Sequence, residues 1–510
     1  MKKLRRRFTQ GLLSCVCLFL VGFFAPPPLE AITFTDSSFF SETVATLAPF
    51  KPVGLTFAPD GRIFIWQRDG VIRIVKNGVL LPTPFLNVSS KVNTYTDHGF
   101  LGVALDPNFV DNGFVYVFYT YEAGGNPNST TPKTGHLSRV TADPSNPDVM
   151  LANSEVILLG TLDVPPCSNY PVGADCFPTD SYTHSVGTLR FLPDGTLLAS
   201  HGEGASADFA DVLALRSQSL DSYAGKLLRI KPDGTAPTAP LVANPFNDGT
   251  NSIRSKVWAY GLRNPFRFGV QPTTGLPFIG DVGWGTWERV EPGAPGANYG
   301  WPCFEGSTPQ PTYQATFPVD CQAVPASAVT MPIYTYDRSV GSTVIGGTFF
   351  TGTQYPAPYA GNFFFAEYTK GWMKRIVFDG SGTVQSVLDF ASNILDVNRT
   401  GGAVAIELGP DGLLYYIVFT TGEIARIRNT SGSGSNFPPF AKAAATPSSG
   451  YAALNVSFSS AGSLDPEGGI LTYLWDFGDG GTSPLPNPVH TCSASVVTLF
   501  PLRLTCTDTL

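Results

Sequence analysis

The chain has 510 residues, of which 53 are glycine, 44 are proline and only 14% are charged. This composition favours short strands joined by turns over long helices, and it is too apolar and aromatic for a disordered protein. Beyond residue 31, 27 basic residues stand against 39 acidic ones, and this balance of −12 argues against nucleic acid or an anionic membrane as a partner.

Residues 1–31 have the pattern of a secretion signal peptide. Five basic residues precede an apolar run of 14 residues from Gly11 to Phe24, which is short for a membrane span. Prolines follow at 26–28, and cleavage after Ala31 fits the pattern. We therefore expect a secreted or periplasmic protein with no membrane span after signal removal. A retained N-terminal anchor is the alternative.

Six cysteines remain after residue 31, and they fall in three local pairs. This usage suits an oxidising compartment. About fifteen connectivities are possible for six cysteines, and we expect neighbours to pair, as Cys167–Cys176, Cys303–Cys321 and Cys492–Cys506. No CxxC or Cys/His metal spacing is present in the sequence.

One pattern recurs six times between residues 50 and 430. Apolar residues precede a turn of the Pro-Asp-Gly type, and an aromatic-rich strand and a further strand follow it; the turns are at 59–61, 107–108, 193–195, 272–275, 358–361 and 410–412. A single such sheet cannot bury both faces, so the copies must stack, and a closed ring removes the exposed edges. The repeat predicts an all-β chain with a six-bladed β-propeller, closed by a strand from residues 32–47. A β-sandwich array is the alternative.

The longest insertions into this repeat lie at 121–187, 200–224 and 280–345. Long connections in a propeller gather on one face over the central channel, where binding sites usually lie. His184, one of only five histidines, lies beside such an insertion. This placement favours a functional role over a purely structural one.

Four segments, in order, resemble the soluble glucose/sorbosone dehydrogenase family: HGFLGVALDPNF (98–109), HSVGTLRFLPDG (184–195), AYGLRNPFRFGVQPTTG (259–275) and GANYGWPCFEG (296–306). The resemblance covers roughly residues 45 to 430. It implies a six-bladed propeller that holds pyrroloquinoline quinone (PQQ) and calcium in its active members.

The resemblance also implies roles for individual residues. His184 corresponds to the base that takes a hydroxyl proton while hydride goes to the quinone. Glu203 is placed to orient His184, and Arg263 and Asn264 correspond to the cofactor-binding Arg-Asn pair. Further cofactor contacts fall on two positions, His98 and Lys370. At the first of these the family has Gln or Glu.

The segment GDVGWGTWERV (280–290) corresponds to the family's calcium and cofactor loop. The carbonyls of Gly283 and Trp284 match the family's ligands, and Asp281 and Glu288 are the carboxylates nearby. Calcium is bound by several oxygens of these kinds. The chain departs from the family at Trp284 and Arg289, where the usual proline and second acid are absent.

Residues 429–437 have the composition of a flexible linker. Residues 438–510 resemble a PKD domain, an immunoglobulin-like β-sandwich, through the motif WDFGDG at 475–480. Trp475 and Phe477 should alternate with Asp476 on a strand before the Gly-Asp-Gly turn. Such domains serve as spacers or as modules that bind carbohydrate at cell surfaces.

Three functions remain open from the sequence. The first is an exported quinoprotein that oxidises a sugar or other alcohol with PQQ and calcium. The second is a non-catalytic propeller that binds extracellular carbohydrate or protein, favoured by the change at 97–98. The third is a calcium-dependent hydrolase of the lactonase type, which would need several acids centred on the channel.

Overall fold

The computed structural model describes residues 32–47, 49–239, 241–395, 401–430, 439, 441, 443–447, 453–461, 463, 470–493 and 502–507. The predicted signal peptide and most of the predicted linker lie outside these residues. Within the described part of the chain, no helix is long and apolar enough to cross a membrane.

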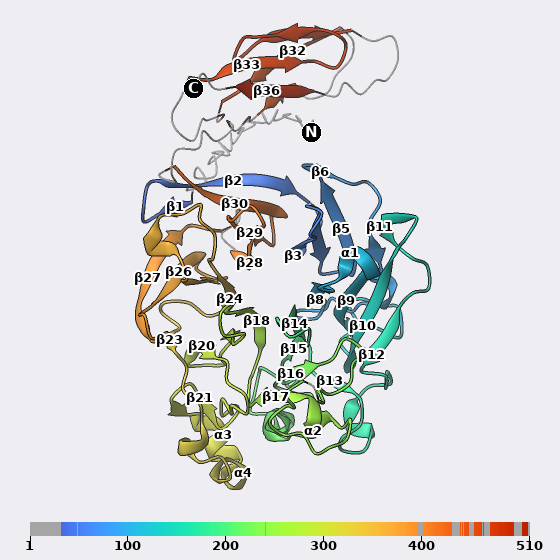
Figure 1. Cartoon of the computed structure of the whole chain (residues 1–510), viewed down its shortest axis with the longest axis vertical. Coiled ribbons are helices and arrows are strands. Elements are labelled where there is room, and N and C mark those ends of the chain that lie inside the picture. Colours follow the sequence, from blue (N-terminus) through green and yellow to red (C-terminus); the bar gives the residue numbers. More distant parts are fainter. Residues whose placement is uncertain are drawn as a thin grey trace, which may run out of the picture. The chain divides into compact units, whose positions relative to one another are not determined.

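Six antiparallel sheets follow one another along the chain and surround a central channel (Figure 1). The first blade consists of β3 (Pro52–Phe57), β4 (Ile63–Gln67), β5 (Val71–Lys76), β6 (Val79–Leu80) and β7 (Leu86–Asn87). The second consists of β8 (Phe100–Leu105), β9 (Phe114–Tyr121), β10 (Lys133–Asp143), β11 (Asn146–Met150), β12 (Val156–Leu159) and β13 (Phe177–Thr179). The third consists of β14 (Val186–Phe191), β15 (Leu197–His201), β16 (Lys226–Ile230) and β17 (Val257–Tyr260).

The last three blades include the two strands that precede the first blade in sequence. The fourth blade consists of β18 (Pro265–Val270), β19 (Pro277–Asp281), β20 (Trp287–Pro292) and β23 (Tyr334–Asp337). The fifth consists of β24 (Val344–Phe349), β25 (Phe363–Glu367), β26 (Trp372–Phe378), β27 (Val384–Ser392) and β1 (Thr33–Phe34). The sixth consists of β28 (Ala403–Leu408), β29 (Leu414–Val418), β30 (Glu423–Asn429) and β2 (Phe39–Thr46).

Short elements occupy the connections. They are the hairpin β21 (Phe304–Glu305) and β22 (Thr308–Pro309), the helices α1 (Phe109–Asn112), α2 (Ile253–Lys256), α3 (Pro311–Thr316) and α4 (Pro318–Gln322), and 3₁₀ helices at Ser89–Lys91, Cys167–Asn169, Val212–Gln218, Ala326–Ala328 and Ala357–Tyr359. The helices are too short to form a layer, so the domain is all-β, as the composition predicts.

The six predicted turns all connect the first and second strands of a blade. Five of their glycines have φ between 72° and 88°, the left-handed region that glycine accepts without strain. The predicted ring closure is also confirmed: β2 pairs with β30 in the sixth blade, while β1 pairs with β27 in the fifth. The segment 32–47 thus supplies strands to two blades.

The first strand of every blade carries an irregular register near its start. Such bulges bend a strand and re-aim its side chains, and they recur next to functional sites. The strands also approach closely around the channel. A Cβ on Gly346 would lie 2.0 Å from the carbonyl oxygen of Arg267 in the adjacent blade, so glycine is required there.

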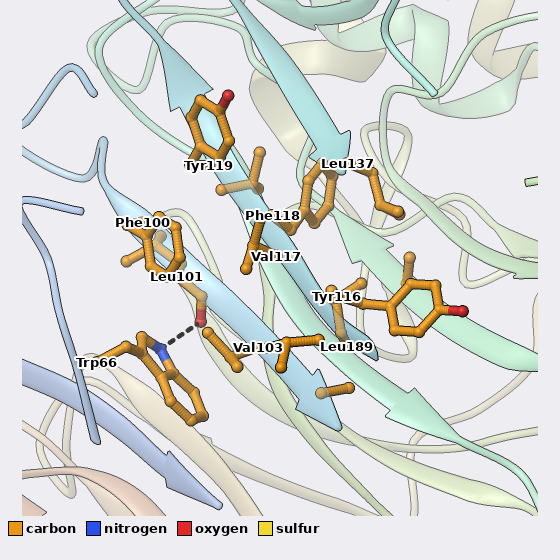
Figure 2. Close-up of a cluster of buried hydrophobic side chains, with 14 of the residues drawn as sticks. Trp66, Phe100, Leu101, Val103, Tyr116, Val117, Phe118, Tyr119, Leu137 and Leu189 are labelled. Atoms are coloured by element: carbon orange, nitrogen blue, oxygen red, sulfur yellow. Dashed lines mark hydrogen bonds between the residues drawn. The ribbon is translucent and has the colours of Figure 1, made fainter. Parts of the chain in front are cut away.

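The blades pack through apolar and aromatic side chains. Figure 2 shows one cluster that joins the first three blades, in which Trp66 Nε1 donates a hydrogen bond to the Leu101 carbonyl at 3.1 Å. Its other labelled members are Phe100, Val103, Tyr116, Val117, Phe118, Tyr119, Leu137 and Leu189. This packing gives the channel rigid walls, because close-packed interiors yield little to strain.

The C-terminal residues form two three-stranded sheets, β31 (Ala444–Thr446), β32 (Leu454–Ser459) and β35 (Val489–Cys492), and β34 (Thr482–Ser483), β33 (Thr472–Asp476) and β36 (Arg503–Thr507). Their core contains Val456, Phe458, Trp475 and Phe477. The predicted alternation of buried Trp475 and Phe477 around exposed Asp476 is confirmed.

Two of the three expected disulfides are present, Cys167–Cys176 and Cys303–Cys321. The third expectation is wrong, since Cys492 and Cys506 are both free thiols. The two cysteines stand on strands of different sheets, since β35 pairs with β32 and β36 pairs with β33.

Candidate functional site

The six innermost strands surround a cavity of about 270 Å³ at one end of the channel. Each strand contributes a residue from its first two positions: Val53, Leu101, Val186, Phe266, Ile345 and Val404. Later residues of five of these strands, all except β24, line a second cavity of about 280 Å³ at the end where the turns lie. Two of the predicted site residues, His184 and Asn264, line the first cavity, as does Ser185.

His184 lies two residues before the start of β14 and has a φ of 53°, which is uncommon for a residue with a side chain. Its ring is buried, and Nδ1 lies 2.8 Å from Glu203 Oε1. The described residues offer no hydrogen-bond partner to Nε2, the other ring nitrogen. A strained backbone conformation held at a cavity wall suggests a functional constraint, and the free nitrogen is the one that can meet a substrate.

Glu203 is fully buried behind His184. One oxygen contacts His184, the other accepts a hydrogen bond from Trp301 Nε1, and the Arg263 Nε atom lies 4.0 Å away. The flanking Gly202 is required, because a Cβ there would lie 2.3 Å from the His184 carbonyl oxygen. The sequence Gly-Glu-Gly therefore lets a carboxylate approach the histidine from behind.

Arg263 and Asn264 have different positions. Asn264 lines the cavity, whereas Arg263 is not among the residues that line it. The Arg263 Nη1 atom donates to the carbonyls of Val282 at 3.1 Å and Gly283 at 2.6 Å. Its guanidinium also faces the Trp301 ring, 5.4 Å from the centroid. Arg263 thus links Glu203 to the predicted calcium loop rather than reaching into the cavity.

The two carboxylates predicted to bind calcium are already engaged within the protein. Asp281 accepts hydrogen bonds from the backbone of Arg263 and Asn264 and from the Arg289 side chain. Glu288 accepts from two backbone N–H groups and from Arg338, and desolvation by burial raises its pKa to about 7.

Only the carbonyls of Gly283 and Trp284 remain for a cation, and the first already binds Arg263. This donor set falls short of the 6–8 oxygens, roughly, that calcium takes. The predicted calcium ligands therefore do not fit the ion as they stand.

A residue that the sequence analysis did not assign, Glu305, holds the same loop. Its Oε1 atom accepts hydrogen bonds from four successive backbone N–H groups, those of residues 284, 285, 286 and 287, at 2.7, 3.0, 3.1 and 3.3 Å. Glu305 and Trp301 belong to one short segment that the Cys303–Cys321 disulfide anchors. This segment fixes both Glu203 and the loop. Glu305 lies in the segment GANYGWPCFEG (296–306), where the motif alone does not indicate which backbone groups the carboxylate contacts.

We expect Glu305→Gln to lower the free energy of unfolding by about 2–3 kcal/mol, because a neutral amide replaces a carboxylate that accepts four N–H groups. Urea unfolding followed by tryptophan fluorescence measures this change, since Trp284 and Trp287 lie in the loop. An unchanged midpoint with an unchanged slope would mean that the loop does not depend on this carboxylate.

Two predicted cofactor contacts lie away from the cavity lining. His98 is buried, with Nδ1 at 2.8 Å from Asn93 Oδ1 and Nε2 at 2.9 Å from the Ser181 carbonyl, and burial lowers its pKa to about 4. Its neighbour Asp97 lines the cavity instead. Lys370 is exposed in the turn after β25, while Tyr368, two residues earlier, lines the cavity.

Four lining residues share a position that the repeat could have revealed. Arg68, Val282, Tyr368 and Phe419 each follow directly after the second strand of a blade, β4, β19, β25 and β29. Arg68 Nη1 donates to the Thr96 carbonyl at 2.7 Å, and its guanidinium lies 5.5 Å from the centroid of the Phe419 ring. The cavity therefore has a positively charged side chain, which is Arg68 and not the predicted Arg263.

Behind the site, Arg289 is buried between Asp281 and Glu291, and its Nε atom lies 3.4 Å from Glu291 Oε1. Burial raises the pKa of Glu291 from 4.5 to about 8. A raised pKa in the folded state means that this residue's contribution to stability is complete below its ordinary pKa and is lost as the pH rises through 8.

We therefore expect Glu291→Gln to leave the free energy of unfolding nearly unchanged at about pH 5 and to raise it by roughly 2–4 kcal/mol at about pH 9. Both oxygens of Glu291 lack a hydrogen-bond partner among the described residues, so the amide loses none. Chemical unfolding at the two pH values measures the difference. An equal effect at both would contradict a raised pKa.

Both parts of the chain match the sequence models of known families. The sequence model of the family described as "Glucose / Sorbosone dehydrogenase" matches residues 50–426, and that of the PKD domain matches residues 436–508. The first match covers well over half of the chain and spans every cavity residue named above.

Individual relatives agree with this match. An uncharacterized Synechocystis protein is 26% identical over 395 residues, which are 74% of this chain and 84% of that protein. Quinoprotein glucose dehydrogenase B of Acinetobacter calcoaceticus is 25% identical, over 58% of this chain and 60% of that protein. A crystal structure of a Thermus putative oxidoreductase (glucose dehydrogenase) is 25% identical with a TM-score of 0.56, covering 76% of this chain and 99% of the other. The chain belongs to the glucose/sorbosone dehydrogenase family.

Proposed function

We propose that the chain is a PQQ-dependent dehydrogenase that oxidises a sugar or other alcohol in the channel cavity. The observation that carries this proposal is the buried His184–Glu203 pair, whose histidine lines a cavity and keeps Nε2 free. The relatives support the reaction class, since one is a quinoprotein glucose dehydrogenase by name.

The cavity has features that suit PQQ, a flat aromatic acid. Phe266 and Phe419 provide aromatic surface, Arg68 provides a guanidinium for a carboxylate, and Asn264 provides an amide. The volume of about 270 Å³ is near the lower end of small-molecule pockets, roughly 300–1,000 Å³. When bound, PQQ supplies an electrophilic quinone carbon that accepts hydride.

The residues of the chain then have distinct tasks. His184 Nε2 takes the proton of the substrate hydroxyl, and Glu203 holds Nδ1, which fixes the tautomer and stabilises the imidazolium that forms. The Arg263 Nε atom, 4.0 Å from Glu203 Oε1, places a positive charge beside this carboxylate. The pair itself is buried, and burial strengthens these electrostatic interactions.

We assign no step to calcium, because Asp281 and Glu288 accept hydrogen bonds from other parts of the protein. The carbonyls of Gly283 and Trp284 are the atoms that a cation would meet after movement of Arg263. Measuring PQQ binding with and without calcium distinguishes a loop whose carbonyls stay with Arg263 from a loop whose carbonyls bind the cation.

We also propose that the protein acts in the periplasm or outside the cell. Two disulfides within the described residues support an oxidising compartment. The PKD domain would act as a spacer or bind carbohydrate at a cell surface.

The test is dye-linked oxidation by the chain without residues 1–31, with and without added PQQ, across a panel of aldoses and simple alcohols. We expect turnover that requires PQQ and saturates with an aldose. Bound PQQ without oxidation of any substrate would contradict the activity. If the chain neither binds PQQ nor oxidises any substrate, the result favours the alternative of a propeller that binds carbohydrate or protein.

A further inference from the structure

Three side chains that bind metals in proteins converge in the C-terminal sandwich. Asp479, His490 and Cys492 each place one ligand atom so that the three atoms lie within 4.8 Å of one another. His490 and Cys492 occupy alternate positions on β35, so their side chains leave the strand on the same face. Asp479 comes from the Gly-Asp-Gly turn that follows β33.

Neighbouring groups orient two of these side chains. The Nε2 atom of His490 lies 2.7 Å from Asp479 Oδ2, and the N–H of Gly481 donates to Asp479 Oδ1 at 2.9 Å. The imidazole stacks on Phe477 with ring centroids 4.1 Å apart and planes 8° apart. The Gly481 N–H and the Phe477 ring are supporting contacts of the kind that orient the ligands of metal sites, whereas the His490–Asp479 contact joins two of the three side chains directly.

Cys492 is available as the third ligand. It is a half-buried free thiol, although the four cysteines of the propeller are paired as disulfides. A thiolate, an imidazole and a carboxylate together match the ligands of zinc, and three protein ligands leave one position of a tetrahedral site for water. The harder cations calcium and magnesium prefer oxygen ligands alone.

We propose that Asp479, His490 and Cys492 bind one Zn²⁺ ion, with a water molecule as the fourth ligand. On binding, the thiol releases its proton, and the His490 proton that faces Asp479 moves to Nδ1 so that Nε2 can bind the metal. The ion ties the Gly-Asp-Gly turn to β35 and links two sheets that lack the Cys492–Cys506 bridge. This site is independent of the function proposed for the propeller.

Cobalt titration of the full chain tests the proposal, because a thiolate bound to Co²⁺ gives a charge-transfer band in the near ultraviolet. Cys492→Ser removes the thiol, and Cys506→Ser, which changes the other free thiol of the same domain, is the matched control. We expect the band in the wild type and in Cys506→Ser, its absence in Cys492→Ser, and its displacement by one equivalent of Zn²⁺.

A second variant, His490→Gln, should weaken zinc competition by about tenfold or more, because it removes one of three protein ligands. Thermal unfolding of the metal-free variants shows whether each still folds like the wild type. Absence of the band in the wild type would overturn the proposal, and so would a band of equal strength in Cys492→Ser.

Discussion

Replacing His184 with asparagine should lower turnover with an aldose by about 10²–10⁴-fold, the usual contribution of a general base. The backbone of His184 has a φ of 53°, and asparagine accepts this region better than most residues. The variant should therefore accept this backbone conformation and fold, with a loss of about 1–3 kcal/mol for the missing hydrogen bond to Glu203. His184→Ala should abolish the same activity and leave folding nearly intact.

Turnover per folded molecule, measured as dye-linked oxidation with saturating PQQ, is the quantity to compare. His136→Asn is a suitable control, because His136 is also buried but stacks on Tyr121 and lines neither of the two channel cavities. We expect that control to keep its turnover. Wild-type turnover in His184→Asn would exclude this histidine as the base.

The second large effect is expected for Glu203→Gln, which should lower kcat by about 10²–10³-fold and change KM little. The amide keeps the shape of the side chain but no longer fixes the His184 tautomer or balances the imidazolium. It also leaves Arg263 buried beside a neutral group. Steady-state kinetics separate the two parameters.

Glu203→Asp should restore part of the lost kcat, since it returns a carboxylate to the same place. Glu291→Gln changes another fully buried acid that lines neither cavity and should keep its kcat. A drop in Glu203→Gln that appears only in KM would point to a role in substrate binding instead.

The fold was largely predictable because the residues that form its turns are local in sequence. Each turn between the first and second strands carries its own glycine or asparagine, and six copies with apolar strands favour a ring over a sandwich array. A closing strand from 32–47 followed from the need to cover edges, whereas the division of this segment between the fifth and sixth blades did not. The wrong disulfide shows the limit, since the sheet that each cysteine joins depends on long-range strand pairing.

The site was predictable only where a motif fixes the backbone. His184 and Glu203 meet because the flanking glycines allow close approach. The direction of other side chains depends on bulges and on register, and a shift of one residue reverses the face. Tyr368 lines the cavity and Lys370 does not, although both lie in one turn. Arg68 was missed because it follows a strand in a blade whose motifs carry no chemistry by themselves.

Titration calorimetry of PQQ into the chain without residues 1–31, with and without calcium, tests the central claim most directly. We predict one equivalent bound, with Arg68→Ala weakening the affinity by about tenfold or more, since a charged hydrogen bond contributes about 1.5–3 kcal/mol. Arg73→Ala, in the same blade but outside both cavity linings, should bind as the wild type does. No binding at about tens of micromolar PQQ, with or without calcium, would contradict the assignment of this cavity as a quinone site.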